Sequence, residues 1–97
     1  MKTLDEIKEI LTEHKGDIGE KYKVKDIGLF GSYVKGKQRE TSDVDVLVEF
    51  EKPVSLLHIV SLENYLSDIL EIKVDVVPRK NIRQELRESI LKEVVPV

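Results

Sequence analysis

The sequence predicts an α/β protein of the α+β type, in which a small mixed sheet of three or more strands is flanked by helices. Short segments rich in apolar and β-branched residues, at 24–30, 43–50 and 72–77, alternate with longer amphipathic segments. The connection between the second and third of these strands is long enough for a helical crossover. All 97 residues fit one domain, 1–97, with one core.

The N-terminal segment 3–15 has the spacing of an amphipathic helix. Apolar residues recur every three or four positions from Leu4 onward, with charged residues between them. Thr3 followed by Glu6 fits a capping box, and Gly16 can end the helix. The first strand is expected at 24–30.

A glycine-serine turn follows the first strand. Gly31 and Ser32 begin this turn and then a short helix to about Lys35, and the polar segment 36–42 is expected to be a loop. The next strand, 43–50, has the clearest alternation in the chain. It places the valines at 44, 46 and 48 on one face and residues 43, 45 and 47 on the other.

The C-terminal half predicts a helix, a strand and another helix. Residues 55–70 carry an apolar stripe at helical spacing. The β-branched segment 72–77 then ends at Pro78. A last helix is expected at 81–93, with Asn81 as its N-cap and apolar residues spaced by four.

Composition narrows the class of protein. Charged residues make up 36% of the chain, yet the net charge is only −3, which argues against a strongly basic nucleic-acid binder. Without cysteine there is no disulfide and no thiolate metal site. No apolar run approaches the roughly 18 residues of a membrane span, and the mixed-charge N-terminus lacks the apolar core of a signal peptide. We therefore expect a cytoplasmic protein.

Two carboxylates stand one residue apart at the start of strand 43–50. Alternate strand residues share a face, so Asp43 and Asp45 should point the same way, roughly 7 Å apart. A solvated strand end is the simpler interpretation of an isolated Asp-x-Asp pair. However, like charges on one face repel unless a cation lies between them.

A third aspartate, Asp75, lies inside the valine-rich strand 72–77, where this residue type is uncommon. If that strand neighbours 43–48, three carboxylates converge. Such a set is what two divalent metals about 3.5 to 4 Å apart require. The sequence therefore suggests chemistry on a nucleotide, with Asp43, Asp45 and Asp75 as metal ligands.

The glycine-serine turn is the candidate phosphate site. Gly31 allows close approach of a ligand, and Ser32 offers a hydroxyl at a helix start. A simple strand-to-helix turn with a serine cap is the competing interpretation. Segment 31–37 also matches Gly-x4-Gly-Lys, but Gln38 stands where a P-loop needs Ser or Thr. The P-loop interpretation is therefore rejected.

Several charged and aromatic residues are open to two interpretations. Lys35 and its neighbours in the loop are either surface charges or a counter-charge to a triphosphate. Lys80, Arg83 and Arg87 share one face of the predicted last helix, either as a solvated face or as a docking patch for an acidic partner. Tyr33 either packs or contacts a base.

The segment Leu-Phe-Gly-Ser at 29–32, ten residues, Asp-Val-Asp at 43–45 and the later Asp75 together resemble the minimal nucleotidyltransferases of the DNA polymerase beta-like superfamily. The similarity extends over nearly the whole chain and includes the ending at 87–93. It implies the nucleotidyltransferase fold, with Gly31 and Ser32 holding the triphosphate of ATP. It also implies two Mg²⁺ ions on Asp43, Asp45 and Asp75, with Asp75 helping to activate the attacking hydroxyl.

The resemblance also implies a partner. Family members of this size are typically antitoxins paired with a small all-helical HEPN toxin, and in such pairs the transferase can add AMP to a tyrosine of the toxin. Many relatives have Ala-Arg-Gly where this chain has 34–36 (Val-Lys-Gly), and Lys35 lacks the two-pronged geometry of arginine. Two alternatives stay open: a binding module that masks the toxin without chemistry, and transfer to a small molecule or RNA. The acceptor, the base and any homo-oligomeric state are not determined.

Overall fold

The computed structural model describes residues 2–97, which form one four-stranded mixed sheet with helices on both sides. The strands are β1 (Val24–Phe30), β2 (Val44–Phe50), β3 (Val74–Pro78) and β4 (Val95–Pro96), in the spatial order β3-β2-β1-β4. β1 is antiparallel to both of its neighbours, and β2 is parallel to β3. The predicted fold class is therefore confirmed.

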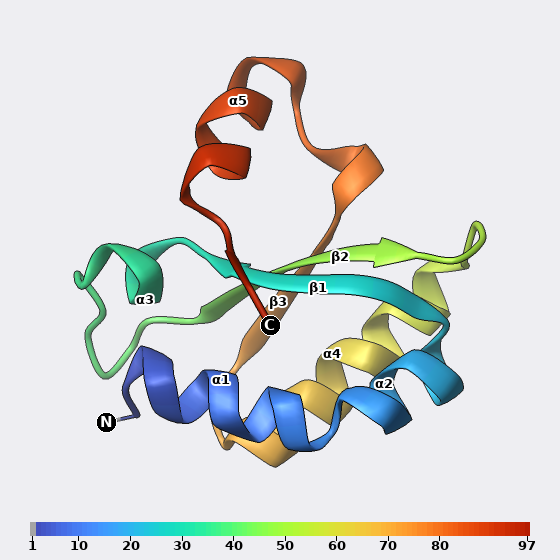
Figure 1. Cartoon of the computed structure of the whole chain (residues 1–97), viewed down its shortest axis with the longest axis horizontal. Helices are drawn as coiled ribbons and strands as arrows, with labels where there is room; N and C mark the ends of the chain where they lie inside the picture. Colours follow the sequence, from blue (N-terminus) through green and yellow to red (C-terminus); the bar gives the residue numbers. More distant parts are fainter. Residues whose placement is uncertain (1) are drawn as a thin grey trace.

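The helices are α1 (Leu4–Glu13), α2 (Lys15–Tyr22), α3 (Ser32–Lys35), α4 (Leu56–Leu70) and α5 (Gln84–Glu93), with a 3-10 turn at Arg79–Asn81. Figure 1 shows α1, α2 and α4 on one side of the sheet and α5 standing apart on the other. Helix α4 is the expected crossover between β2 and β3, which is why these two strands run parallel. No helix within residues 2–97 has both the length and the apolar character needed to cross a bilayer.

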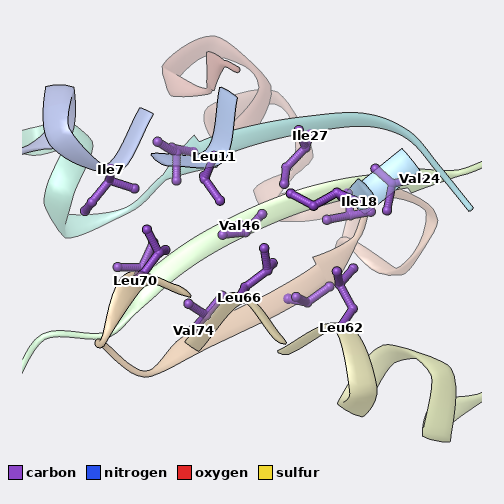
Figure 2. Packing of buried hydrophobic residues seen from close by; sticks show 14 of the residues in the cluster. Ile7, Leu11, Ile18, Val24, Ile27, Val46, Leu62, Leu66, Leu70 and Val74 are labelled. Carbon is purple, nitrogen blue, oxygen red and sulfur yellow. The ribbon is translucent and has the colours of Figure 1, made fainter. Parts of the chain in front are cut away.

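The core lies between the sheet and the helices α1, α2 and α4. Alternate valines of β2 point into it and are fully buried, as the pattern at 44, 46 and 48 predicts. Leu62, Leu66 and Leu70 of α4 belong to the same core, and Figure 2 shows Leu66 next to Val46 with Leu70 and Leu62 to either side. The opposite face of β2 is thereby left for Asp45 and its strand neighbours.

The expected helix 3–15 is two helices. The capping box is confirmed: Glu6 N–H donates to Thr3 Oγ1 (3.2 Å), and Thr3 N–H donates to Glu6 Oε1 (3.1 Å). Helix α1 ends at Glu13, His14 is the cap residue between the two helices, and α2 starts at Lys15 and runs through Gly16. Gly16 does not stop a helix here, because burial of Ile18 outweighs the low helix propensity of glycine.

The expected helix 81–93 starts three residues late. Asn81 belongs to the 3-10 turn and is not an N-cap, since Arg83 precedes the first turn of α5. Ile82 has extended backbone and is buried, so the spacing by four does not form one apolar stripe. Lys80, Arg83 and Arg87 therefore do not share one helix face.

Strand β4 was not expected from the sequence, because its two residues are too few to show an alternating pattern.

Candidate functional site

Gly31 turns the chain from β1 into α3 at the edge of the open sheet face. Its φ of +84° and ψ of −152° lie in a region that is essentially reserved for glycine. A Cβ at this position would overlap the carboxylate of Asp45. The turn therefore packs its backbone directly against an acidic side chain, and only glycine permits both the conformation and the contact.

Asp45 lies at the centre of the site, because β2 is bordered by β1 and β3. It is in register with Phe30 on one side and with Asp75 on the other. Residues opposite one another on neighbouring strands point to the same face, so Asp45 and Asp75 are side-by-side neighbours. The condition on which the convergence of the carboxylates depended, that these two strands are neighbours, is met. Their carboxylates lie on the face opposite the core, beside the Gly31 turn.

Helix α4 fixes the backbone of the strand that carries Asp75. Val74 N–H donates to Ser67 Oγ (3.0 Å), and Val76 N–H donates to Glu63 Oε2 (2.8 Å). β3 is an edge strand, so these two amides have no further strand to pair with. Side chains of α4 satisfy them on both sides of Asp75, which holds its position opposite Asp45.

The electrostatic environment of Asp45 is unfavourable to its charge. Partial burial raises the pKa of this carboxyl, and the negative charges of Asp75, Asp43 and Glu93 raise it further. Asp43 lies just before β2, its side chain is 35% exposed, and its Oδ2 lies 3.9 Å from Lys73 Nζ. Negative charge is therefore concentrated around Asp45, and a bound cation would relieve the repulsion between these carboxylates.

Carboxylate oxygens are the ligands that Mg²⁺ prefers, so the chemistry of this donor set fits a hard divalent cation. The side chains as they stand do not close around one. Across residues 2–97, no three His, Cys, Asp or Glu side chains are arranged to hold a metal ion. Asp45 and Asp75 are brought together, whereas Asp43 lies toward Lys73.

Glu93, at the end of α5, is a member of this site that pattern reasoning did not single out. Gly31 N–H donates to Glu93 Oε1 (2.9 Å), and Lys35 Nζ lies 3.5 Å from Glu93 Oε2. No spacing rule relates residues 62 positions apart. The one available signal was the family-like ending at 87–93, which contains Glu93.

Tyr33 is 4% exposed and belongs to the core, which favours the packing interpretation over contact with a base. Ser32 is the first residue of α3 and is half-buried, next to Gly31. The turn therefore presents a glycine amide, a serine and the exposed ammonium of Lys35 toward the same edge of the sheet.

The site thus combines a strand-to-helix turn with two aspartates paired across neighbouring strands. A family model described as the nucleotidyltransferase domain matches residues 11–97. This chain belongs to the nucleotidyltransferase domain family. The match spans the Gly31 turn and all three aspartates, so the resemblance seen in the sequence is confirmed.

Curated relatives of this nucleotidyltransferase include archaeal proteins of nearly the same length. One from Methanocaldococcus jannaschii, provisionally named a protein adenylyltransferase, is 53% identical over 96% of this chain and 95% of its own. The protein adenylyltransferase MntA of Thermococcus cleftensis is 46% identical over 100% of this chain and 98% of its own. The chain is accordingly an enzyme of the nucleotidyltransferase class.

Solved structures agree on the fold. A structure provisionally identified as a minimal nucleotidyltransferase superposes with a TM-score of 0.76 at 29% identity, covering 94% of this chain and 95% of the other. A toxin-antitoxin complex with AMP-PNP gives a TM-score of 0.72 at 23% identity, covering 87% of this chain and 69% of the other. A complex of a tri-AMPylated Shewanella oneidensis HEPN toxin with an MNT antitoxin gives a TM-score of 0.68 at 18% identity, covering 93% of this chain and 70% of the other. At these lower identities the last two show the shared fold alone.

Proposed function

We propose that this nucleotidyltransferase transfers AMP from ATP to a tyrosine hydroxyl of a HEPN-family toxin, and so acts as the antitoxin of a toxin-antitoxin pair. One observation carries the proposal: Asp45 and Asp75 stand in register beside the Gly31 turn. The names of the closely similar relatives, protein adenylyltransferases, support AMP as the transferred group. The structural neighbours that pair an MNT antitoxin with a HEPN toxin support the partner.

The turn supplies the groups that bind the triphosphate. The Gly31 amide and the Ser32 hydroxyl can donate to phosphate oxygens, and Lys35 contributes a positive charge. A lysine acts there as a point charge, whereas arginine would form a two-pronged contact. These three residues would orient the α-phosphorus toward the aspartates.

The aspartates supply the metal ligands. Asp43, Asp45 and Asp75 would hold two Mg²⁺ ions, which when bound neutralise charge on the phosphates and on the attacking oxygen. A carboxylate oxygen of Asp75 accepts the proton of the tyrosine hydroxyl while the tyrosine oxygen forms a bond to the α-phosphorus. The bond from that phosphorus to pyrophosphate breaks, so AMP remains on the tyrosine.

Incubation of the chain with labelled ATP, Mg²⁺ and its cognate HEPN partner tests this proposal. The parent should label the partner, and Asp43→Asn or Asp45→Asn should lower the rate by roughly 100-fold or more. Asp26→Asn, on the exposed part of β1, is the matched control and should label normally. Labelling by Asp43→Asn at the parent rate would contradict the proposal.

Masking of the toxin without chemistry is the second candidate function. It is favoured by one observation: Glu93 already engages both the Gly31 amide and Lys35. A variant with both Asp43→Asn and Asp45→Asn separates the two functions. If it still neutralises the toxin fully in cells, masking is correct; if toxicity returns, chemistry is required.

A further inference from the structure

The carboxylate of Glu93 spans two groups of the turn at once. One oxygen accepts from the Gly31 amide at 2.9 Å, and the other lies 3.5 Å from Lys35 Nζ. The Glu93 side chain is 21% exposed, while that of Lys35 is 54% exposed. The Glu93 carboxylate, partly shielded from water, therefore already binds the Gly31 amide and lies beside the Lys35 ammonium.

The C-terminal segment holds Glu93 in this place. Helix α5 ends at this residue, and β4 then pairs with β1 at Gly28 and Leu29. A side chain on residue 28 would press against Val94, so the segment lies close over β1. Figure 1 shows the red C-terminal strand crossing β1 below α5.

This anchor is short. β4 has two residues, and none of the residues of α5 is buried. Beyond the strand pairing, the Val97 amide donates to Ile27 O (3.1 Å) and Lys15 Nζ donates to Val97 O (2.9 Å). Segments with few buried apolar contacts open at low free-energy cost. Glu93 therefore has a defined position that it can leave at a low free-energy cost.

We infer that Glu93 occupies the phosphate position of the nucleotide-free enzyme and must leave it when ATP binds, so that Glu93 sets the affinity for nucleotide. The Gly31 amide has a single proton and cannot serve a carboxylate and a phosphate fully at the same time. A carboxylate facing a triphosphate would also repel it. This inference rests on the proposed function, because it takes Gly31 and Lys35 as the phosphate-binding groups.

Affinity for AMP-PNP with Mg²⁺, measured by calorimetry on the full chain, tests the inference. Glu93→Ala removes both contacts and should bind on the order of five- to ten-fold more tightly. Glu93→Gln keeps an acceptor for the Gly31 amide but loses the charge, so its gain should be smaller. Glu88→Gln, on the same helix and paired only with Lys92 in the described residues, is the matched control and should bind as the parent does.

Two further readouts keep the result interpretable. In a Lys35→Ala background the gain from Glu93→Gln should shrink, because the two side chains share one interaction. Without nucleotide, the Gly31 amide proton should shift upfield in the NMR spectrum of Glu93→Ala, since it loses a charged acceptor. An unshifted Gly31 proton would show that the contact does not persist in solution and would overturn the inference.

The outcomes separate this inference from the proposed function. If the parent binds AMP-PNP and transfers AMP, but both folded Glu93 variants bind no more tightly, Glu93 supports the turn and only the competition is wrong. If neither the parent nor any folded variant binds AMP-PNP with Mg²⁺, both the competition and the proposed function are wrong. Circular dichroism melts establish that each variant is folded.

Discussion

At the scale of single residues, the site depends on a close contact between a backbone turn and a charged side chain. Gly31 lies against the carboxylate of Asp45, and its backbone conformation excludes side chains. Gly36, five residues later, also has a positive φ (+70°), but a Cβ there would meet open space. Gly36 therefore reports the cost of a left-handed backbone alone, whereas Gly31 combines a glycine-only conformation with the loss of space.

Gly31→Ala should lower the free energy of unfolding by about 2–4 kcal/mol and abolish AMP transfer, because the new methyl group displaces Asp45 as well as straining the backbone. Gly36→Ala should cost only about 1 kcal/mol, from the left-handed backbone alone, and should leave transfer intact. Urea denaturation with a parallel transfer assay measures both. Equal costs for the two substitutions would show that the contact with Asp45 is not limiting.

At the scale of elements, α4 has two roles. Its leucines pack into the core, and its polar residues Glu63 and Ser67 satisfy the outer amides of β3. The sequence predicted the first role, since the apolar residues recur at helical spacing. It did not predict the second, because a glutamate on a helix does not indicate which amide it will accept from.

Glu63→Ala should lower the free energy of unfolding by about 1–2 kcal/mol, since the Val76 amide loses its partner. The rate of AMP transfer should fall too, because Asp75 directly precedes Val76 on β3 and loses its fixed position. Glu63→Gln keeps an oxygen acceptor and should differ little from the parent in either assay. If Glu63→Ala were as stable and active as Glu63→Gln, the amide contact would have no role in placing Asp75.

At the scale of the whole molecule, acidic groups from separate elements act on one carboxyl. Asp75 comes from β3, Asp43 from the segment before β2, and Glu93 from α5, and together with burial they raise the pKa of Asp45. A raised pKa in the folded state means that the ionised carboxylate opposes folding. This opposition is present above the folded pKa and disappears as the pH falls below it.

Asp45→Asn should therefore be more stable than the parent at pH 7, and the difference should shrink as the pH falls through the pKa of Asp45 toward the ordinary range of about 4. Mg²⁺ should raise the melting temperature of the parent more than that of Asp45→Asn, because the cation relieves the same repulsion. Thermal melts between pH 4 and 8, with and without Mg²⁺, measure both effects. A parent that gains stability relative to Asp45→Asn as the pH rises would contradict the sign.

Much of the molecule follows from local patterns in the sequence. The valine alternation defined β2 and the placement of Asp45 away from the core, and Thr3 with Glu6 defined the start of α1. The spacing of the glycine turn, the Asp-Val-Asp segment and Asp75 was sufficient to indicate the family. These features depend on residues a few positions apart, where backbone geometry alone sets which side chains share a face.

Only the tertiary structure decided the features that join distant segments. It placed Glu93 on the Gly31 amide, brought the Gly31 turn against the carboxylate of Asp45, and paired β4 with β1. It also moved the start of α5 to Gln84 by burying Ile82. Periodicity cannot predict such contacts, because they depend on how whole elements pack and on which buried groups then need a partner.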